Sequence, residues 1–528
     1  MSSNIALPFL RSLELHPGRL ALYAHGDEWT YGELGVIVKK IAGWIGQGAA
    51  GEGRKVGILA SRSLEACAGI LGVGWSGSAY VPLSVKQPPA ALAQLFGVLG
   101  LDAIICDAEG ARLLLGVSAI SGHRLPKRVL VPDAVAREWS FVKEITRWGD
   151  LTDEMLHGPA EMYADSIAYI EFTSGSTGAP KGVMVPCGAV NAFCDFAEKR
   201  YAFEPEDRFA GSSDITFDLS VFDMFCCWRA GASLHIVPSN VTIAPGRFLN
   251  ERGVTVCLTV PSVAAMMSRM GLLQPASLPA LRWSLFCGEP LPAASAQAWR
   301  IAAPNSAVEN LYGPTEATVA CLYEPIGEQT KTTPERAIVA IGRPFENGMR
   351  AMIVDERMTQ APRRAPGELA LAGPQLALGY YNAPEKTSAR FVPIDGDRWY
   401  LTGDLAYEDD EGTFHHLGRV DNQIKVLGHR VELEAVESHL RQHLATDSAA
   451  AVAWPVSFGA ASGIIGFVTG EAHLGEARAT LRKHMPPHMV PNAIHRVPEL
   501  PLTPNGKVDR KALTRMLEEG KFESVSRG

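Results

Sequence analysis

The sequence predicts an α/β protein with a large N-terminal domain of parallel or mixed sheets flanked by helices, followed by a small α+β domain. The chain has 528 residues, which exceeds one ordinary core because a domain usually holds roughly 100 to 200 residues. Short β-branched runs alternate with helical periodicity in the first half, as is typical of βαβ construction. After Tyr400 the pattern changes to a turn-rich stretch.

The alternation is clearest before residue 110. Three apolar runs rich in β-branched residues predict strands, and two segments with helical periodicity lie between them. The predicted strands are 55–61, 79–84 and 102–107, and the predicted helices are 64–77 and 90–100. The same style continues from 165 to about 354. This half therefore predicts parallel strands covered by helices on both faces.

The C-terminal part begins with charged turns. Residues 418–425 are polar with an adjacent glycine, and such exposed connections are where domain boundaries fall. A charged segment, 431–444, follows and predicts a helix. We therefore expect a core domain over 1–420 and a smaller mobile subdomain over 421–528.

Charge and cysteine content exclude several classes of protein. The formal net charge is −8, from 57 acidic and 49 basic side chains, so no basic footprint predicts nucleic-acid binding. Nine cysteines without a CxxC pair fit neither a disulfide framework nor a zinc site. The N-terminus lacks the features of a signal peptide, and no apolar run reaches about 18 residues. We therefore expect a cytoplasmic protein without a membrane span.

Residues 172–182 read FTSGSTGAPKG and follow the predicted strand 166–172. Glycines let backbone N–H groups converge on a phosphate, while hydroxyls and a lysine add donors and charge. The sequence is not a Walker loop, because Gly182 stands where that motif has a hydroxyl. A flexible surface turn is the alternative interpretation. The predicted phosphate-binding residues are Thr173, Ser174, Gly175, Ser176, Thr177, Gly178 and Lys181.

Further motifs follow one another along almost the whole chain. They are WTYGEL (29–34), SAYVPL (78–83), FDLSVFDMF (217–225), NLYGPTEATV (310–319), GELALAGPQLALGYYN (367–382), YLTGD (400–404), LGRVDNQIKVLGHRVE (417–432) and PLTPNGKVDRKAL (501–513). Together with the phosphate loop they resemble the adenylate-forming superfamily. The resemblance is to the amino-acid adenylation enzymes of nonribosomal peptide synthesis and their free-standing relatives.

The resemblance implies a reaction and a set of nucleotide contacts. A carboxylate attacks the α-phosphate of ATP, pyrophosphate leaves, and an acyl-adenylate forms. Such a transfer needs positioning and charge neutralisation, with no protein nucleophile. By resemblance, Tyr312 stacks on adenine, Thr315 contacts the α-phosphate and Glu316 ligates Mg2+. A flat ring, a hydroxyl and a hard oxygen ligand suit these roles.

The motifs near the C-terminal part imply further roles. Asp404 resembles the carboxylate that accepts both ribose hydroxyls, and Arg419 resembles a second ribose contact. Asp421 resembles the hinge about which the small domain turns between two half-reactions. Lys507 resembles the lysine that bridges the substrate carboxylate and the AMP phosphate during adenylation. Lys425 is implied to face the site in the thioester-forming orientation.

Asp218 matches the aspartate that pairs with the α-ammonium of amino-acid substrates in this family. It favours an α-amino acid over a fatty, aryl or acetyl acid, since a buried carboxylate needs a cation. The alternative is a solvated aspartate that caps a helix. The remaining pocket positions carried over are Leu219, Phe222, Leu258, Leu285, Cys287, Leu311, Val319 and Ala320. This set is apolar apart from one thiol and includes no second charge, so a small apolar amino acid is expected.

Two subgroups remain open for the substrate. The pattern Asp218–Leu219, with Leu311 and Val319 around YGPTE, looks like L-proline:carrier-protein ligases. The strings FCGEPLP and YGPTEATVA also resemble D-alanine:carrier-protein ligases and alanine-loading enzymes, although Leu311 and Leu258 depart from the D-alanine pattern. L-Proline is the leading expectation and alanine is next, with valine and 2-aminobutyrate open.

Two rival functions come from other classes. An acyl-CoA synthetase would have little use for Asp218, and a catalytically silent adenylate-binding protein would not need Glu316, Asp404 and Lys507 together. Only a short tail follows Lys507, with no carrier-protein serine motif. We therefore expect a free-standing enzyme that uses ATP and Mg2+. Its thiol acceptor is expected to be the phosphopantetheine of a separate carrier protein, which docks transiently.

Overall fold

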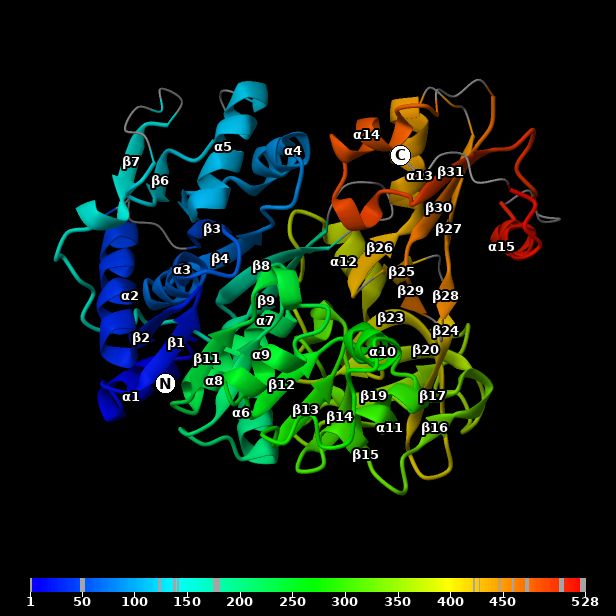
Figure 1. Cartoon of the computed structure of the whole chain (residues 1–528), viewed down its shortest axis with the longest axis horizontal. Helices are drawn as coiled ribbons and strands as arrows, with labels where there is room; N and C mark the ends of the chain where they lie inside the picture. Colours follow the sequence, from blue (N-terminus) through cyan, green and yellow to red (C-terminus); the bar gives the residue numbers. More distant parts are fainter. Residues whose placement is uncertain are drawn as a thin grey trace.

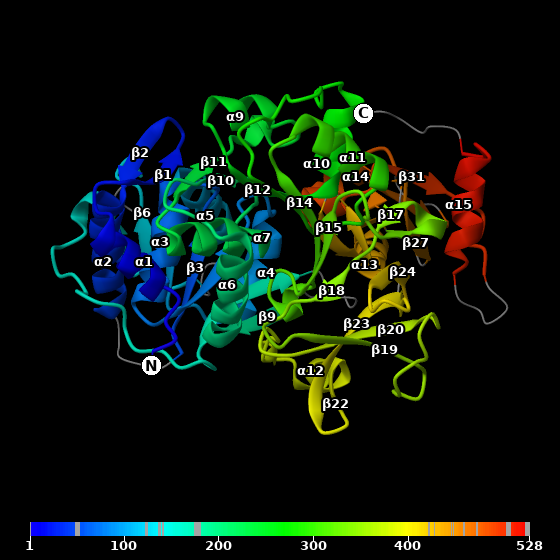
Figure 2. The ribbon, with the colours of Figure 1, turned by 90° about the horizontal axis from the view of Figure 1, so that it is seen from below.

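The computed structural model describes residues 2–47, 53–121, 125–135, 139, 142–173, 181–420, 423–426, 428–444, 446, 448–457, 460–470, 474–502 and 508–522. Strands and helices alternate through a large N-terminal part, and a smaller part with its own sheets follows (Figure 1). The predicted α/β class is confirmed. Seen from below, α2 (Tyr31–Gly46) lies near one end of the long axis and α15 (Arg510–Glu518) at the other (Figure 2).

One sheet of the large part contains the three strands predicted before residue 110. Strands β4, β3, β5, β6 and β7 run parallel, whereas β8 pairs antiparallel with β9. The sheet order is β21 (Gly379–Tyr380), β9 (Lys181–Pro186), β8 (Ile167–Thr173), β4 (Ala79–Leu83), β3 (Lys55–Leu59), β5 (Ala103–Cys106), β6 (Arg128–Val131) and β7 (Glu144–Arg147). The predicted βαβ alternation is therefore present here.

The helices between these strands also lie where periodicity predicts them. They are α3 (Leu64–Trp75) and α4 (Pro89–Leu99). Ser63 caps α3, because its side chain accepts the N–H of Ala66. Gly72 allows α3 to pack closely on α2, since a Cβ there would lie 2.6 Å from Ile41 Cγ2. Small residues thus set the spacing of this helix pair.

A second large sheet has nine strands. Its order is β18 (Arg343–Pro344), β15 (Leu322–Ile326), β14 (Ala307–Tyr312), β13 (Trp283–Phe286), β12 (Val256–Thr259), β10 (Arg208–Gly211), β11 (Ser233–Ile236), β1 (Leu20–Ala24) and β2 (Asp27–Thr30). The strands from β14 through β1 run parallel, and antiparallel strands close both edges. The carboxyl end of β14 carries Tyr312, which places the NLYGPTE motif at a sheet edge where ligands of α/β folds bind.

The remaining elements of the large part are an antiparallel sheet, a small strand pair and the covering helices. The antiparallel sheet has the order β19 (Arg350–Val354), β20 (Gly367–Ala372), β23 (Asp397–Glu408) and β22 (Phe391–Ile394), with β24 (Phe414–Arg419) also on β23. The pair is β16 (Thr332–Thr333) and β17 (Ile338–Val339). The helices are α1 (Leu7–Leu15), α5 (Ala108–Ser121), α6 (Cys187–Tyr201), α9 (Gly246–Glu251), α10 (Pro261–Arg269), α11 (Ala293–Ala302) and α12 (Pro384–Arg390).

A short helix of mixed type follows Asp218. It begins as α7 (Leu219–Val221), widens into a π-helical turn over Phe222–Cys226, and returns to α8 (Cys227–Arg229). Its side chains are largely buried, including Phe222 and the adjacent thiols of Cys226 and Cys227. π-Helical turns are rare and are frequently found at functional sites.

The C-terminal part has its own sheets and helices. One sheet has the order β26 (His429–Glu432), β25 (Gln423–Val426), β29 (Ala460–Ala461) and β28 (Val456–Ser457). The other has the order β27 (Ala449–Ala453), β30 (Ile464–Val468) and β31 (Ala493–Arg496). The helices are α13 (Leu433–Leu444), α14 (Ala477–Arg482) and α15.

The predicted helix 431–444 starts too early. The structure begins α13 at Leu433, because Val431 and Glu432 belong to β26 and pair with β25. Val431 is β-branched and fully buried opposite Ile424, which favours a strand. The described ends of the predicted polar connection 418–425 are strand, since β24 ends at Arg419 and β25 starts at Gln423.

The described core clusters divide near the same point. The clusters of the large part contain buried residues up to Phe414, and those of the C-terminal part start at Val426. Asp421 lies outside the described residues, so the boundary between 420 and 421 and the hinge role stay predictions. None of the helices in the described ranges is long and apolar enough to cross a membrane.

Candidate active site

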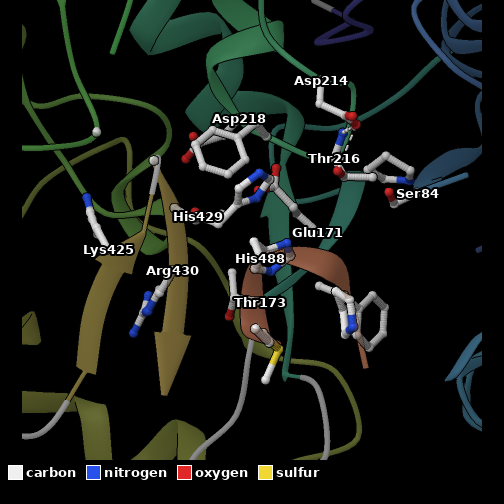
Figure 3. A pocket seen from close by; sticks show the side chains of 18 of the residues that line it. Ser84, Glu171, Thr173, Asp214, Thr216, Asp218, Lys425, His429, Arg430 and His488 are labelled. Atoms are coloured by element: carbon white, nitrogen blue, oxygen red, sulfur yellow. Dashed lines mark hydrogen bonds between the residues drawn. The ribbon is translucent and has the colours of Figure 1, made fainter. Parts of the chain in front are cut away.

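A cavity of about 470 Å³ is lined by both the large part and the C-terminal part. Its walls come from segments far apart in sequence, including the end of β8, the start of α7 and the β25–β26 hairpin (Figure 3). The end of β14 also contributes, through Tyr312. Ten of the predicted site residues line it: Thr173, Asp218, Leu219, Cys287, Tyr312, Thr315, Val319, Asp404, Arg419 and Lys425. The structure therefore brings together in space residues for which the motifs give only the order along the sequence.

The first wall is built around the carboxylate of Asp404 in β23. Arg419 Nη1 donates to Asp404 Oδ1 at 2.8 Å, and the hydroxyl of Tyr312 donates to Oδ2. His416 Nε2 lies 3.5 Å from Oδ1. Burial raises the pKa of Asp404, but the hydrogen bond from His416 and the charge of Arg419 outweigh it, so the pKa lies below its ordinary value. Asp404 is therefore an ionised acceptor that faces the cavity.

Glu316 lies beside the cavity in the turn after β14 and is fully buried. Arg430 Nη1 lies 3.1 and 2.9 Å from its two carboxylate oxygens, and the Tyr380 hydroxyl donates at 2.7 Å. Burial raises the pKa of Glu316, but the charge of Arg430 outweighs this effect and lowers it. Glu316 is therefore ionised and neutralised by the C-terminal part.

The donor set fits a magnesium ion that is shared with phosphates. The described residues contain no cluster of three or more metal-ligating side chains. Mg2+ commonly takes one or two protein carboxylates and completes its shell with substrate phosphates and water, so a single Glu316 suffices. Thr173 Oγ1 is buried without a hydrogen-bond partner at the same cavity, and an orphaned hydroxyl of this kind fits a phosphate oxygen.

The predicted phosphate loop is described only at its two ends. Thr173 and Lys181 are register partners on the antiparallel strands β8 and β9, so the ends of the loop lie opposite one another. Lys181 Nζ lies 3.4 Å from Glu432 Oε1 of β26. Residues Ser174, Gly175, Ser176, Thr177 and Gly178 lie outside the described residues, and so does Lys507.

Asp218 is buried at the base of the cavity. It stands at the N-cap position of α7, but its side chain makes no capping hydrogen bond, so the capping interpretation is wrong. Burial raises the pKa of Asp218 to about 6. Hydrogen bonds from the Thr315 side chain and the Val319 N–H, together with the charge of Lys425, oppose this rise. Within the described residues no cation lies at ion-pair distance from Asp218, although the charge of Lys425 in the same cavity acts on it.

The apolar wall next to Asp218 is smaller than the predicted set. Leu219, Cys287 and Val319 line the cavity. The other predicted pocket residues are buried in the same hydrophobic cluster but are not among the lining side chains. These are Phe222, Leu258, Leu285, Leu311 and Ala320. They belong to the hydrophobic cluster that includes the wall, but they do not line the cavity.

The sequence interpretation missed two acidic residues of this cavity, Glu171 and Asp214, and Asp214 is paired with Lys86 at 2.9 Å. Glu171, in β8, is 5% exposed and lines the cavity with Thr173, two residues further on the same strand face. Its carboxyl accepts the backbone N–H of Asp218, while burial and the charge of Asp218 raise its pKa well above the ordinary value. The signal in the sequence was an acid inside the apolar run 166–172. The cavity therefore holds acidic groups beside Asp218 and Asp404 that the sequence did not predict.

The β25–β26 hairpin forms the wall opposite Asp218 and brings Lys425 into the cavity. The Gly428 N–H donates to Glu289 Oε1 at 2.5 Å. The ring of His429 meets Phe217 edge-on at 5.1 Å and stacks on His488 at 4.0 Å. Burial lowers the pKa of both histidines, that of His488 to about 3, so this stack is neutral.

Comparisons with known proteins agree with this arrangement. Residues 9–381 match the family described as AMP-binding enzyme, and residues 435–507 match the AMP-binding enzyme C-terminal domain. An L-proline--[L-prolyl-carrier protein] ligase of Pseudomonas fluorescens is 30% identical over 96% of this chain and 98% of its own. A linear gramicidin synthase of Brevibacillus parabrevis is 31% identical over 96% of this chain, which spans only 10% of that protein.

A solved structure shares both the fold and the domain content. The crystal structure of the Vibrio cholerae adenylation domain AlmE, in complex with glycyl-adenosine-5'-phosphate, superposes with a TM-score of 0.88. The two chains are 30% identical, and the match covers 98% of each.

Proposed function

Because the chain belongs to the AMP-binding enzymes, as an adenylate-forming enzyme of the amino-acid-activating kind, we propose that it converts a small apolar amino acid to an aminoacyl-adenylate with ATP. It then passes the aminoacyl group to the phosphopantetheine thiol of a carrier protein. The observation that carries the choice of an amino acid is the buried carboxyl of Asp218, which faces the cavity and forms no ion pair with any described residue. A substrate ammonium supplies the missing cation.

The nucleotide binds along the wall formed by Tyr312, Asp404 and Arg419. Tyr312 offers its ring to adenine, and the ionised Asp404 accepts the ribose hydroxyls. Thr173 and Lys181, at the two ends of the phosphate loop, donate to phosphate oxygens. A magnesium ion held by Glu316 supplies neutralisation of the charge on the phosphates. Thr315, which hydrogen-bonds to Asp218, lies between the amino-acid and phosphate positions.

In the first half-reaction the chain's residues hold two reactants in line. An oxygen of the amino-acid carboxylate forms a bond to the α-phosphorus, and the bond from that phosphorus to pyrophosphate breaks. No proton moves, so the site needs no general base for this step. Lys507 is proposed to bridge the two anions, as its motif implies. Asp218 fixes the amino acid at the other end.

In the second half-reaction the thiol forms a bond to the carbonyl carbon, its proton leaves, and AMP departs with the bonding electron pair. Lys425 lies in the cavity, where its charge acts on Asp218 and Cys287. This location supports an orientation of the C-terminal part that serves thioester formation. Rotation about Asp421 is proposed to exchange this orientation with the adenylating one.

L-Proline is the leading substrate and alanine the second. The narrow apolar wall of Leu219, Cys287 and Val319 suits a compact side chain. The proline ligase supports the first choice, but AlmE is equally similar in sequence and its structure contains a glycyl group. Overall similarity therefore does not select the amino acid. Binding differences of one methylene, worth about 1 to 3 kcal/mol, decide it.

ATP–pyrophosphate exchange tests the proposal. The panel comprises L- and D-amino acids together with acetate, benzoate and a fatty acid. A strong signal for L-proline supports the leading substrate, and a stronger one for L- or D-alanine assigns the enzyme to the alanine-activating group. Exchange that responds only to a simple acid contradicts the role of Asp218. Acceleration of turnover by free coenzyme A would instead favour an acyl-CoA synthetase.

A further inference from the structure

Strand β26 carries two charges that reach across to the large part. Arg430 and Glu432 are two residues apart, so their side chains leave the same face of the strand. Arg430 contacts both oxygens of Glu316, at 2.9 and 3.1 Å. Glu432 Oε1 lies 3.4 Å from Lys181 Nζ. All four side chains are at most 16% exposed.

The two partners of this strand are the groups that the proposed function gives to the metal and the phosphates. A cation, Arg430, sits on the carboxylate that would hold Mg2+. An anion, Glu432, sits on the lysine that would hold a phosphate. Arg430 is positive like the metal that it would replace, and Glu432 is negative like the phosphates that it would replace. The match therefore occurs at two separate points of one strand.

Resting on the proposed function, we propose that Arg430 and Glu432 are positioning residues for the second half-reaction. They take the places of the metal at Glu316 and of the phosphates at Lys181. The orientation that brings Lys425 into the cavity is then stable only after magnesium and pyrophosphate have left, so the charge exchange sets the order of the two steps.

Electrostatics explains why such an exchange is needed. Glu316 is fully buried, and removing the partner of a buried charge is strongly destabilising. Departure of the metal would leave this carboxylate unpaired. Arg430 Nη1 reaches both oxygens of Glu316, at 3.1 and 2.9 Å, so a guanidinium charge replaces the charge of the metal. The positive charge of Arg430 beside both oxygens repels a divalent cation, so this contact and metal binding at Glu316 oppose each other.

The hairpin register links this contact to Lys425. Lys425 and Arg430 are directly opposite each other on β25 and β26, and Gln423 is opposite Glu432. Gln423 Nε2 donates to Glu432 Oε1 at 2.5 Å. When Arg430 and Glu432 engage the large part, the adjacent strand is held with Lys425 in the cavity. Loss of either contact should therefore loosen the approach of Lys425.

The test is a distance measurement between two spin labels, one on α12 at Glu385→Cys and one on α13 at Gln442→Cys. Both positions are exposed, and all nine native cysteines are buried, so labelling is selective. The protein is measured alone, with ATP and EDTA, and with ATP and Mg2+, without amino acid. ATP with Mg2+ is expected to move most wild-type molecules to a second distance. The fraction at that distance should be at least threefold larger than with ATP and EDTA.

Arg430→Gln is expected to populate the second distance even without nucleotide and to lose the dependence on Mg2+. Arg430→Lys restores the charge and should recover part of the wild-type behaviour. Arg441→Gln, an exposed arginine on α13, is the matched control and should behave as wild type. If Arg430→Gln and wild type give the same distances under all three conditions, the inference is overturned.

A kinetic comparison separates positioning from a general structural defect. Arg430→Gln should slow transfer to the carrier thiol at least tenfold more than it slows ATP–pyrophosphate exchange. Glu432→Gln should shift the same ratio in the same direction. Equal losses in both half-reactions would overturn the inference. The proposed function fails separately if none of the acids in the panel supports pyrophosphate exchange by the wild type. The distance measurement uses only ATP and Mg2+, so its outcome does not depend on that result.

Discussion

The hydroxyl of Tyr312 donates a hydrogen bond to the carboxylate of Asp404, and this contact joins two different sheets. Tyr312 ends β14 of the nine-stranded sheet, whereas Asp404 lies in β23 of the antiparallel sheet. The residues that are proposed to bind the nucleoside are therefore held from two sides. Arg419, on β24 of the same antiparallel sheet as Asp404, donates a second hydrogen bond to this carboxylate.

Tyr312→Phe tests this contact. The ring remains for stacking, but the hydrogen bond to a buried charged acceptor is lost, which is worth about 1.5 to 3 kcal/mol. The KM for ATP in pyrophosphate exchange should rise roughly 10- to 150-fold by that range, while the KM for the amino acid changes little. Tyr407→Phe, on the same strand as Asp404 but outside the cavity lining, is the control. An unchanged KM for ATP would contradict the role given to Tyr312.

Asp218→Asn tests amino-acid recognition. Loss of the charge removes the partner of the substrate ammonium, so the KM for the amino acid should rise by about two orders of magnitude, in line with a buried charged hydrogen bond of about 1.5 to 3 kcal/mol. The KM for ATP should stay near wild type. Burial raises the pKa of Asp218 to about 6, so removal of this buried charge should not lower the melting temperature.

The raised pKa of Asp218 predicts a pH dependence. Only the ionised carboxyl pairs with an ammonium, and it protonates as the pH falls through about 6. The KM for the amino acid should therefore be flat above pH 7 and rise roughly tenfold per unit well below pH 6. Exchange kinetics between pH 5 and 8 measure this profile. A flat profile down to pH 5 would show that Asp218 does not titrate in this range.

Glu171 is expected to be protonated at neutral pH, because burial and Asp218 raise its pKa. Glu171→Gln keeps an acceptor for the Asp218 N–H and should leave the KM for the amino acid within about threefold of wild type. Glu171→Leu removes the acceptor and should raise this KM about tenfold, since an unsatisfied buried N–H costs roughly 1 to 3 kcal/mol. Equal effects of both variants would mean that charge, not hydrogen bonding, is the contribution of Glu171.

Cys287→Ala tests how the wall controls substrate size. The thiol is buried beside Leu219 and Val319 at the cavity, and its removal makes room for about one methylene. The ratio of kcat/KM values should shift toward the next larger apolar amino acid by roughly 10- to 200-fold. Leu285→Ala, behind the wall, is the comparison for a general loss of packing. An unchanged ratio would show that the thiol does not limit side-chain size.

The sequence predicted the first strands, and it singled out residues that the structure places around one cavity, for separate physical reasons. β-Branched runs such as 102–107 bury every side chain of β5, and a continuous apolar run is a local signal. The ten predicted residues that line the cavity were singled out because the motifs preserve their order. Glu171 and Arg430 were missed, because their importance depends on contacts with Asp218 and Glu316, which are distant in sequence. Val431 was assigned to a helix because local charge periodicity outweighed its cross-strand partner Ile424.

The widened turn that follows Asp218 has a consequence for engineering this pocket. A π-helical turn accommodates one residue more than an α-helical turn, so the span Phe222–Cys226 behaves as a built-in insertion. Deletion of a single residue there would be absorbed by a return to ordinary helix, which removes one side chain and narrows the turn while Leu219 and α8 keep nearly their present relative orientation. Chain length in this short span, as much as side-chain identity, is therefore a variable with which the amino-acid site can be redesigned.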